Sequence, residues 1–274
     1  MPFKDILIPI DDTKSYPTRL QAAITLARAH NAQLTGLYIL PYYETLFYAS
    51  AYIEMELLRE EQEEAKARAK EREAEFRATT ESTGLTAEWI FVKGEPIHQL
   101  ITHARRHDLV IIGQADPQDP YSMGIGFASQ MVLGGGRPVL IIPYIGPAST
   151  LGERIMVAWN GSREAVRAVN DALPLLARAK RVNVITINPP GEENEISNAD
   201  ICHHLNRHGI QTTTTYLPAT DIEVGDALLS RAADDNIDLI IMGAYGHSRM
   251  REIVLGGATR HLLKFMTVPI LMSH

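Results

Sequence analysis

The stretch that decides the fold is Asp-Leu-Ile-Ile-Met-Gly at residues 238–243, because it has a near copy, Asp-Leu-Val-Ile-Ile-Gly, at residues 108–113. The two copies lie 130 positions apart. Continuous apolar runs of this kind are typical of strands that are buried on both faces of a parallel sheet. The pattern therefore indicates that the same buried strand occurs twice in this chain.

Other segments repeat in the same order. Gly-Phe-Ala-Ser at 126–129 resembles Gly-Gly-Ala-Thr at 256–259, again 130 positions later. The opening strands, at 6–13 and 155–162, match with a spacing of 149, so the first half holds 19 extra residues before its fourth strand. A repeat of this length is a duplicated domain rather than a unit of a solenoid.

The closing strands match as well, with Arg-Pro-Val-Leu-Ile-Ile at 137–142 and Val-Pro-Ile-Leu-Met at 268–272. Residues 144–152 join the two copies and contain the Gly, Pro and Ser that are typical of linkers. We therefore expect two domains, residues 1–146 and 152–274. An open apolar edge strand invites aggregation, so we expect the closing strands to pair in an internal pseudo-dimer.

Within the second half, apolar β-branched runs alternate with helical patterns. The expected strands lie near 154–159, 181–187, 210–217, 238–243 and 268–273, and the expected helices near 162–178, 197–208, 222–236 and 256–266. This alternation favours parallel strands joined by right-handed crossovers. We predict an α/β protein made of two tandem doubly wound domains, each with a mainly parallel five-stranded sheet.

The extra residues of the first half lie between Glu44 and Thr83. Residues 59–68 are highly charged and strongly helix-forming, whereas residues 46–53 are apolar and aromatic. One interpretation is a long surface helix with one end packed on the sheet. The alternative is that the apolar end covers a partner or the cleft of the neighbouring domain.

The composition excludes several classes of protein. The chain has 274 residues, of which 45% are hydrophobic and 22% charged, so it is neither disordered nor of low complexity. No apolar run approaches the roughly 18 residues of a membrane span, and no secretory leader is evident. A net charge of −7 offers no basic face for nucleic acid. A single cysteine, Cys202, indicates a reducing compartment and hence the cytoplasm.

A set of glycines follows the repeated strand in the second half. Gly243-Ala244-Tyr245-Gly246 ends that strand, and after nine residues Gly256-Gly257-Ala258-Thr259 opens a helix. Glycine lets the backbone approach a ligand closely, and a helix N-terminus presents free N–H groups and a positive dipole end. With His247 and Arg249 nearby, the pattern favours an anion at this edge of the sheet.

Both halves resemble the universal stress protein family, whose nucleotide motif is G-x2-G-x9-G followed by Ser or Thr. The resemblance implies an adenine nucleotide alpha hydrolase-like fold that binds ATP or a related adenine nucleotide, which Mg²⁺ can accompany. It places the base near the first two strands and the phosphates in the glycine loop. The implied site consists of Asn160, Ile187, Met242, Gly243, Gly246, His247, Arg249, Gly256, Gly257, Ala258 and Thr259.

The chain departs from the family pattern at informative positions. Gly257 stands where the family has Ser or Thr, and Asn160 stands where it has Asp. In the first half, Asp116 replaces the second glycine and Phe127 follows the third. A carboxylate and a bulky ring oppose a polyphosphate by charge and by shape. We therefore assign the nucleotide to the second domain and a structural or regulatory role to the first.

Other groups of residues have plainer interpretations. His204 and His208 have the i, i+4 spacing of zinc ligands, but a solvated helix face is the simpler explanation, as it is for His103 and His107. Cys202 has no adjacent basic residue to activate its thiol. Neighbouring strand-end residues point apart, which speaks against a joint role for Asp11 and Asp12.

Three functions remain open on this sequence. The first is a stress-response or signalling protein that binds an adenine nucleotide in its second domain, with the protein partner unknown and a homodimer as a further option. The second is an ATP-using enzyme, and the third is a scaffold without ligand. No Walker-type Gly-Lys-Ser/Thr is present, so any ATP hydrolysis is expected to be slow.

Overall fold

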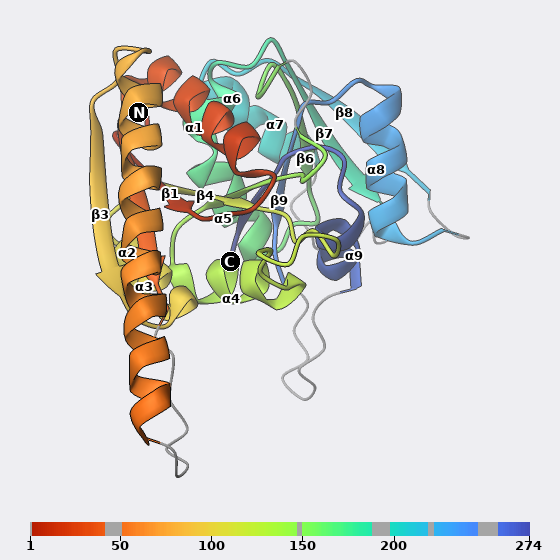
Figure 1. Ribbon diagram of the computed structural model, residues 1–274. Coiled ribbons are helices and arrows are strands. Elements are labelled where there is room, and N and C mark those ends of the chain that lie inside the picture. Colours follow the sequence, from red (N-terminus) through yellow and green to blue (C-terminus); the bar gives the residue numbers. More distant parts are fainter. Residues whose placement is uncertain (1, 42–50, 147–149, 188–197, 219–221, 246–256) are drawn as a thin grey trace.

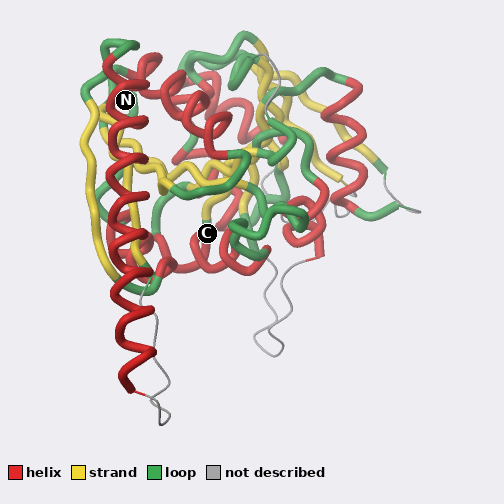
Figure 2. Tube along the Cα trace, viewed as in Figure 1, coloured by secondary structure: helices red, strands yellow, loops and turns green. Residues whose placement is uncertain are grey.

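The computed structural model describes the whole chain except residue 1 and residues 42–50, 147–149, 188–197, 219–221 and 246–256 (Figures 1 and 2). The first half contains β1 (Asp5–Ile10), α1 (Tyr16–His30), β2 (Gln33–Leu40), α2 (Ala51–Glu81), β3 (Ala87–Lys93), α3 (Pro96–Ala104), β4 (Leu109–Gly113), α4 (Ile125–Gly135) and β5 (Val139–Ile142). The second half contains β6 (Arg154–Ala158), α5 (Arg163–Asp171), α6 (Leu173–Leu176), β7 (Arg181–Ile187), α7 (Asn198–Arg207), β8 (Thr212–Leu217), α8 (Val224–Asp234), β9 (Leu239–Gly243), α9 (Gly257–Phe265) and β10 (Ile270–Ser273).

The strands form one sheet of ten in the order β3-β2-β1-β4-β5-β10-β9-β6-β7-β8. The two halves contribute five strands each in the same order, and within each half the strands are parallel. The expected duplication of a doubly wound domain is therefore confirmed. The order reverses between β1 and β4 and again between β6 and β9, and at such points the loops diverge and leave a crevice.

The halves meet through their last strands, as the sequence predicts. β5 and β10 pair in antiparallel fashion, with Leu140 opposite Leu271. Beside this pairing, the side-chain amide of Gln114 donates to the carbonyls of Leu263 and Lys264 at 3.3 and 3.0 Å, and its oxygen accepts from the backbone of Tyr144. Gln114 thus ties the end of β4 to the C-terminus of α9 in the other half.

Helices cover both faces of the sheet (Figure 1). One apolar cluster includes buried residues of α1, α2, α5, α6 and α7, and the other includes those of α3, α4, α8 and α9. Neighbouring strand residues alternate between them: Ile6 and Ile8 belong to the first cluster, and Leu7 belongs to the second. This is the two-sided burial that continuous apolar strands require. No helix in the described part of the chain is long and apolar enough to cross a membrane.

The long helix α2 packs on the sheet through its C-terminal part. Ala65, Ala69 and Phe76 are buried, and Phe76 fits over β2 because Gly36 leaves room for its ring. Charged pairs such as Arg77–Glu73 cover the outer face. This part agrees with the interpretation of a surface helix packed on the sheet. The apolar segment 46–53 lies outside the residues whose side chains are described, so its role stays a prediction.

The prediction of one helix at 162–178 is wrong in one respect. The segment forms two helices, α5 and α6, which are divided at Ala172. Pro174 lies in the first turn of α6. Proline lacks the N–H that would continue the hydrogen bonds of the α-helix, and its ring clashes with the carbonyl four residues earlier. The chain therefore ends one helix and begins another.

The aspartate that opens each repeated strand anchors the start of a neighbouring strand. The carboxylate of Asp238, only 1% exposed, accepts hydrogen bonds from the hydroxyl of Thr150 and from the backbone N–H groups of residues 152–154, at 2.6–3.1 Å. Asp108 accepts from the N–H groups of Lys4 and Asp5 in the first half. The Asp of the repeated motif therefore fixes where the opening strand enters the sheet.

We expect Asp238→Asn to lower the free energy of unfolding by about 3 kcal/mol, because an amide nitrogen would face buried donors that then lack an acceptor. Urea unfolding measures the change. The exposed Asp234→Asn is the matched control and should cost less than about 0.5 kcal/mol. Equal losses in the two variants would contradict the anchoring role.

His30 makes the fold sensitive to acid. It is 3% exposed and packs on the ring of Phe3 with 5.0 Å between centroids. Burial, with a smaller contribution from the charge of Arg178, lowers the pKa of His30 from 6.5 to about 4. The unfolded chain binds this proton near pH 6.5 and the folded chain does not, so stability falls as the pH drops from 6.5 toward 4.

We expect the urea midpoint to decrease between pH 7 and pH 5, and the decrease to be smaller in His30→Leu. The exposed His98→Gln is the control and should keep the pH dependence of the parent chain. A pH profile that is unchanged in His30→Leu would show that other groups carry the acid sensitivity.

Candidate functional site

A cavity of about 460 Å³ lies at the carboxyl ends of β6, β7 and β9, where the strand order of the second half reverses. We call it the C-terminal cavity. Its walls come from the ends of these strands and from the first turns of α8 and α9, through Ala158, Trp159, Asn160, Ile185, Ile187, Glu223, Val224, Gly225, Leu228, Met242, Gly243, Tyr245, Gly257, Ala258 and Thr259. Its volume is within the range of small-molecule sites.

Asn160 forms the turn between β6 and α5. Its side-chain oxygen accepts from the backbone N–H of Ser162 at 3.1 Å, and Ser162 in turn caps α5 by accepting from the N–H of Ala165. Asp11 makes the same turn in the first half by accepting from the N–H of Thr13 at 3.1 Å. Both Asn and Asp form turns of this type, so the substitution at residue 160 preserves the backbone while removing a charge.

Gly243 is required by a close approach of two backbones. A Cβ atom at this position would lie 2.4 Å from the backbone nitrogen of Ala165 and 2.4 Å from the carbonyl carbon of Glu164. The end of β9 therefore contacts the first turn of α5. Asn160, which follows β6 and precedes α5, therefore lines the same cavity as Met242.

The N-terminus of α9 forms the opposite wall. The helix begins at Gly257, and Thr259 is buried in its first turn. A Cβ atom at Gly257 would meet no atom within 4 Å, and the residue does not need a positive φ. The first N–H groups of a helix lack partners within the helix and attract anions. The cavity therefore combines apolar strand ends with an electropositive helix end.

Tyr245 links the cavity to the first half. Its backbone is left-handed, with φ of 61°, which is uncommon for a tyrosine. Burial raises the pKa of the Tyr245 phenol, and the neighbouring Ser129 on α4 partly offsets this rise. Tyr245 therefore lines the C-terminal cavity and also contacts α4 of the other half.

One group of His, Asp and Glu side chains in the described part of the chain has ligand atoms close enough to hold a metal: Glu223, Asp226 and His261, all within 4.8 Å. His261 contacts Glu223 at 3.1 Å and Asp226 at 2.8 Å. Its ring lies over Gly225, where a Cβ atom would be 2.7 Å away. These contacts join the first turn of α8 to α9 beside the C-terminal cavity.

The structure brings together the described residues of the predicted site. Asn160, Ile187, Met242, Gly243, Gly257, Ala258 and Thr259 all line the C-terminal cavity. Gly246, His247, Arg249 and Gly256 lie outside the described residues, so their place in the site stays a prediction.

One wall of the cavity is formed by residues that were not predicted from the sequence. Glu223, Val224, Gly225 and Leu228 come from α8, which follows the third strand of the second half. A parallel sheet brings the start of this helix to the same edge as the glycine loop. Gly225, in the first turn of this helix, was the one sequence feature that could have indicated a close approach to a ligand. Tyr245 was also missed, although it lies between two motif glycines.

The weaker metal and thiol candidates gain no support. The rings of His204 and His208 pack edge to face at 4.9 Å, and no third ligand converges with them among the described residues. Cys202 is a free, half-buried thiol that packs against the apolar core. The other histidine pair, His103 and His107, also makes structural contacts. The side chain of His103 contacts Arg106, and its backbone carbonyl accepts a hydrogen bond from the ring of His107.

A duplicated, doubly wound sheet with a cavity at the strand switch point defines the class of α/β proteins that bind ligands at the carboxyl ends of their strands. Within this class, the model of the universal stress protein family matches residues 2–134 and 152–274. The chain therefore belongs to the universal stress protein family, in its tandem form.

Individual relatives agree with this assignment. A universal stress protein of Archaeoglobus fulgidus has the same fold, with a TM-score of 0.75, 19% identity, and coverage of 98% of this chain and 97% of its own. A universal stress protein of Pseudomonas aeruginosa matches with a TM-score of 0.56 and 15% identity over 99% of this chain and 93% of its own.

The curated relatives match over short segments. Universal stress protein Slr1230 of Synechocystis is 41% identical over 46 residues, which is 17% of this chain and 16% of that protein. Universal stress protein MJ0577 of Methanocaldococcus jannaschii is 34% identical over 47 residues, 17% of this chain and 29% of that protein. The alignments thus span less than a third of either curated relative.

We expect Gly243→Ala to lower the free energy of unfolding by about 3 kcal/mol, because the added methyl would enter the backbone of α5. Gly257→Ala adds the same methyl in open space and is the matched control, with an expected change below about 0.5 kcal/mol. Thermal and urea unfolding compare the two. A Gly243→Ala protein as stable as the control would refute the close contact.

Proposed function

We propose that the C-terminal cavity binds an adenine nucleotide, ATP or a close relative, and that the first half does not bind one. The observation that carries the proposal is the convergence of Asn160, Ile187, Met242–Gly243 and Gly257–Thr259 on one cavity. The resemblance to the universal stress protein family implies all of these residues, and they come from separate segments of the second half.

The chemistry of the cavity suits the two ends of such a ligand. Ile185, Ile187 and Met242 offer apolar surface for a planar base. The first turn of α9 offers backbone N–H groups and a positive dipole end for phosphate. Thr259 adds a hydroxyl in that turn. Gly257 gives phosphate oxygens close access to the backbone, at the cost of the hydroxyl that the family motif carries.

The first half is equipped differently at the equivalent edge. Phe127 stands where the second half has Gly257, and it lines a separate cavity of the first half. Asp116 stands where the second half has Gly246. A ring and a carboxylate at these positions support the proposal of a single nucleotide per chain.

The site is proposed to hold its nucleotide rather than consume it. Glu223 is the only acidic side chain among the described residues that line the cavity, and its side chain is 73% exposed. Fast phosphoryl transfer needs a positioned water and a metal-held triphosphate. Mg²⁺ would accompany ATP as its ordinary counterion, and a neutral Asn160 is a weaker ligand for it than Asp.

The cellular role that fits is a nucleotide-responsive stress or signalling protein in the cytoplasm. Membership of the universal stress protein family supports the stress role. The single free cysteine supports a reducing compartment. Tyr245, which lines the cavity and neighbours Ser129 on α4, supplies a physical route from the cavity to the first half.

The first experiment measures stoichiometry. Isothermal titration calorimetry with ATP, ADP and AMP is expected to give one site per chain, and mass spectrometry of freshly purified protein should show the nucleotide it carries. Two equivalent sites per chain would contradict the assignment to the second half. A steady-state hydrolysis rate of about 1 per second or faster would favour the enzyme hypothesis instead.

A pair of substitutions at one residue tests the site itself. Gly257→Ser restores the hydroxyl of the family motif in open space and should tighten ATP binding by about three- to tenfold. Gly257→Asp places a carboxylate at the same helix end and should weaken binding at least about tenfold by repelling phosphate.

The matched control for charge is Gly126→Asp, at the start of α4 in the first half. It adds the same negative charge to the chain and should leave ATP affinity unchanged within about twofold. Equal weakening by Gly126→Asp and Gly257→Asp would move the nucleotide out of the C-terminal cavity.

A further inference from the structure

The first half keeps a cavity of its own, of about 360 Å³, at the carboxyl ends of β1, β2 and β4. We call it the N-terminal cavity. It lies at the place in the repeat that the C-terminal cavity occupies in the second half, since both follow the strand pair at which the sheet order reverses. Divergence of the glycine motif therefore changed the walls of this cavity without filling it.

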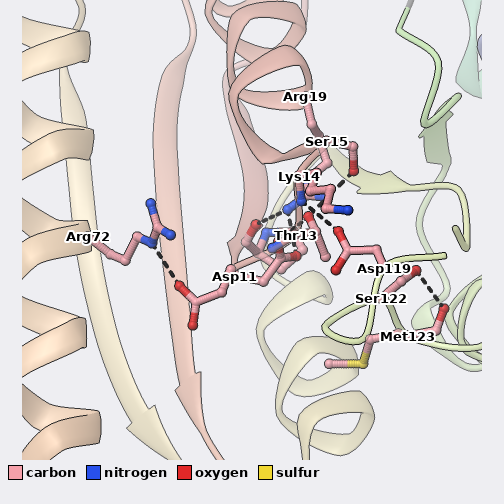
Figure 3. Close-up of polar contacts among 11 residues, drawn as sticks. Asp11, Thr13, Lys14, Ser15, Arg19, Arg72, Asp119, Ser122 and Met123 are labelled. Carbon is pink, nitrogen blue, oxygen red and sulfur yellow. Dashed lines mark hydrogen bonds and ion pairs between the residues drawn. The ribbon is translucent and has the colours of Figure 1, made fainter.

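In the first half, residues 114–124 between β4 and α4 replace the glycine motif, and the carboxylate of Asp119 within this loop binds backbone donors. The carboxylate of Asp119, 5% exposed, accepts from the backbone N–H of Lys14 at 2.6 Å and from that of Tyr121 at 3.0 Å (Figure 3). The hydrogen bond from Lys14 is the main cause that holds the pKa of Asp119 below its ordinary value, so the carboxylate stays charged. The N–H groups of Lys14 and Tyr121 are thus occupied and do not face an incoming anion.

The remaining backbone donors of residues 116–122 are also turned inward. The N–H of Asp116 donates to the hydroxyl of Ser122 at 2.7 Å, and the N–H of Gln118 donates to the carboxylate of Asp116 at 2.9 Å. The N–H of Ser122 donates to the carbonyl of Asp119. Residues 117 and 120 are prolines without an N–H. The loop therefore differs in kind from a phosphate cradle of free backbone amides.

Charged side chains around the N-terminal cavity are matched in pairs. Arg19, 2% exposed, binds Asp11 at 2.6 Å, and Asp12 binds Arg72 of α2 at 2.8 Å. The other charged residue of the lining, Arg68, pairs with Glu64 at 3.6 Å. Figure 3 shows Arg72 reaching across from α2 toward the end of β1. Among the described residues of the lining, both arginines therefore have a carboxylate partner, and neither offers a phosphate an unpaired positive charge.

The rest of the wall is apolar and aromatic. Tyr38, Tyr121, Met123 and Phe127 line the cavity together with aliphatic residues at the ends of β2 and β4. Tyr121 is 64% exposed and Met123 is 41% exposed, so both leave apolar surface in water. Aromatic rings and a thioether favour a flat aromatic ligand, against which they can stack or pack edge-on.

We infer that the N-terminal cavity is a second ligand site, which binds an uncharged aromatic small molecule and rejects phosphate-bearing ones. Its ligand differs in charge from the one proposed for the C-terminal cavity, and the two assignments stand on different residues. The first half is then a binding module in its own right, joined to the nucleotide module by the shared sheet.

Two probes that share one skeleton test the charge selectivity. N-phenyl-1-naphthylamine is uncharged, and 8-anilino-1-naphthalenesulfonate carries the same rings with an added sulfonate. Fluorescence titration of the full chain is expected to show one saturable site for the neutral probe, unchanged by saturating ATP, and at least about tenfold weaker binding of the sulfonate. Equal affinity for the two probes, or displacement of the neutral probe by ATP, would overturn the proposal.

Variants place the probe within the cavity. The double variant Tyr121→Ala with Met123→Ala removes exposed side chains, so it should fold normally and weaken the neutral probe at least about fivefold. Leu133→Ala is the matched control, because Leu133 is 45% exposed on α4 and lies outside the lining of this cavity. It should leave the affinity unchanged, and an equal loss in the control would refute the location.

Asp119→Ala tests the role of the internal anion. It frees the N–H groups of Lys14 and Tyr121, so it should tighten the sulfonate probe at least about fivefold while changing the neutral probe less than about twofold. A melting curve confirms that the variant is folded. A folded Asp119→Ala protein that still rejects the sulfonate would show that Asp119 does not exclude anions.

Discussion

The rest of the structure depends on the antiparallel pairing of β5 with β10. Each is a four-residue strand at the edge of its own half, and all of its residues are buried. An edge of this kind, left open, would expose unpaired backbone groups beside apolar side chains. Pairing turns two edges into the centre of a ten-stranded sheet. Arg167 of α5 adds a bond to the carbonyl of Gly136, so helices as well as strands join the halves.

One topology, used twice, carries two cavities with different linings. In each half the first strand ends in a turn that is held by the side chain of Asp11 or Asn160. The strand beside it in the sheet, β4 or β9, ends in a glycine. Gly113 and Gly243 both lie where a side chain would strike a neighbour, the guanidinium of Arg19 or the backbone of α5. The two glycines therefore allow Arg19 and α5 to pack closely against the strand ends. We propose that the loop that follows decides what each crevice accepts.

The fold could be predicted well because its signal is local and repeated. The buried strands, the duplication and the pairing of the closing strands follow from apolar runs at matched spacings. The break between α5 and α6 was missed because helix periodicity outweighed one proline, Pro174. The motif residues of the C-terminal cavity were found because glycine spacing is local too. The α8 wall was missed, since only the assembled sheet brings Val224 and Leu228 to the same cavity as Met242 and Gly243.

Long-range hydrogen bonds and ion pairs explain why the lining of the N-terminal cavity could not be predicted from the sequence. Asp116 and Phe127 indicated a loss of phosphate binding, but nothing local shows that Asp119 binds the backbone of Lys14, 105 residues earlier. The pairing of Asp12 with Arg72 likewise spans 60 residues, from β1 to the inserted helix. Such contacts are set by tertiary packing, and sequence patterns of the strands and helices carry no trace of them.

The single covalent chain has a consequence for how the two halves evolve. If the halves were separate molecules, their association would depend on concentration, and a pair of identical copies would carry identical crevices. The short join between β5 and β6 makes the pairing intramolecular, at an effective concentration of about millimolar or above. Assembly is then independent of how much protein a cell makes. A mutation in one crevice also leaves the other untouched, so natural selection can act on the two sites separately.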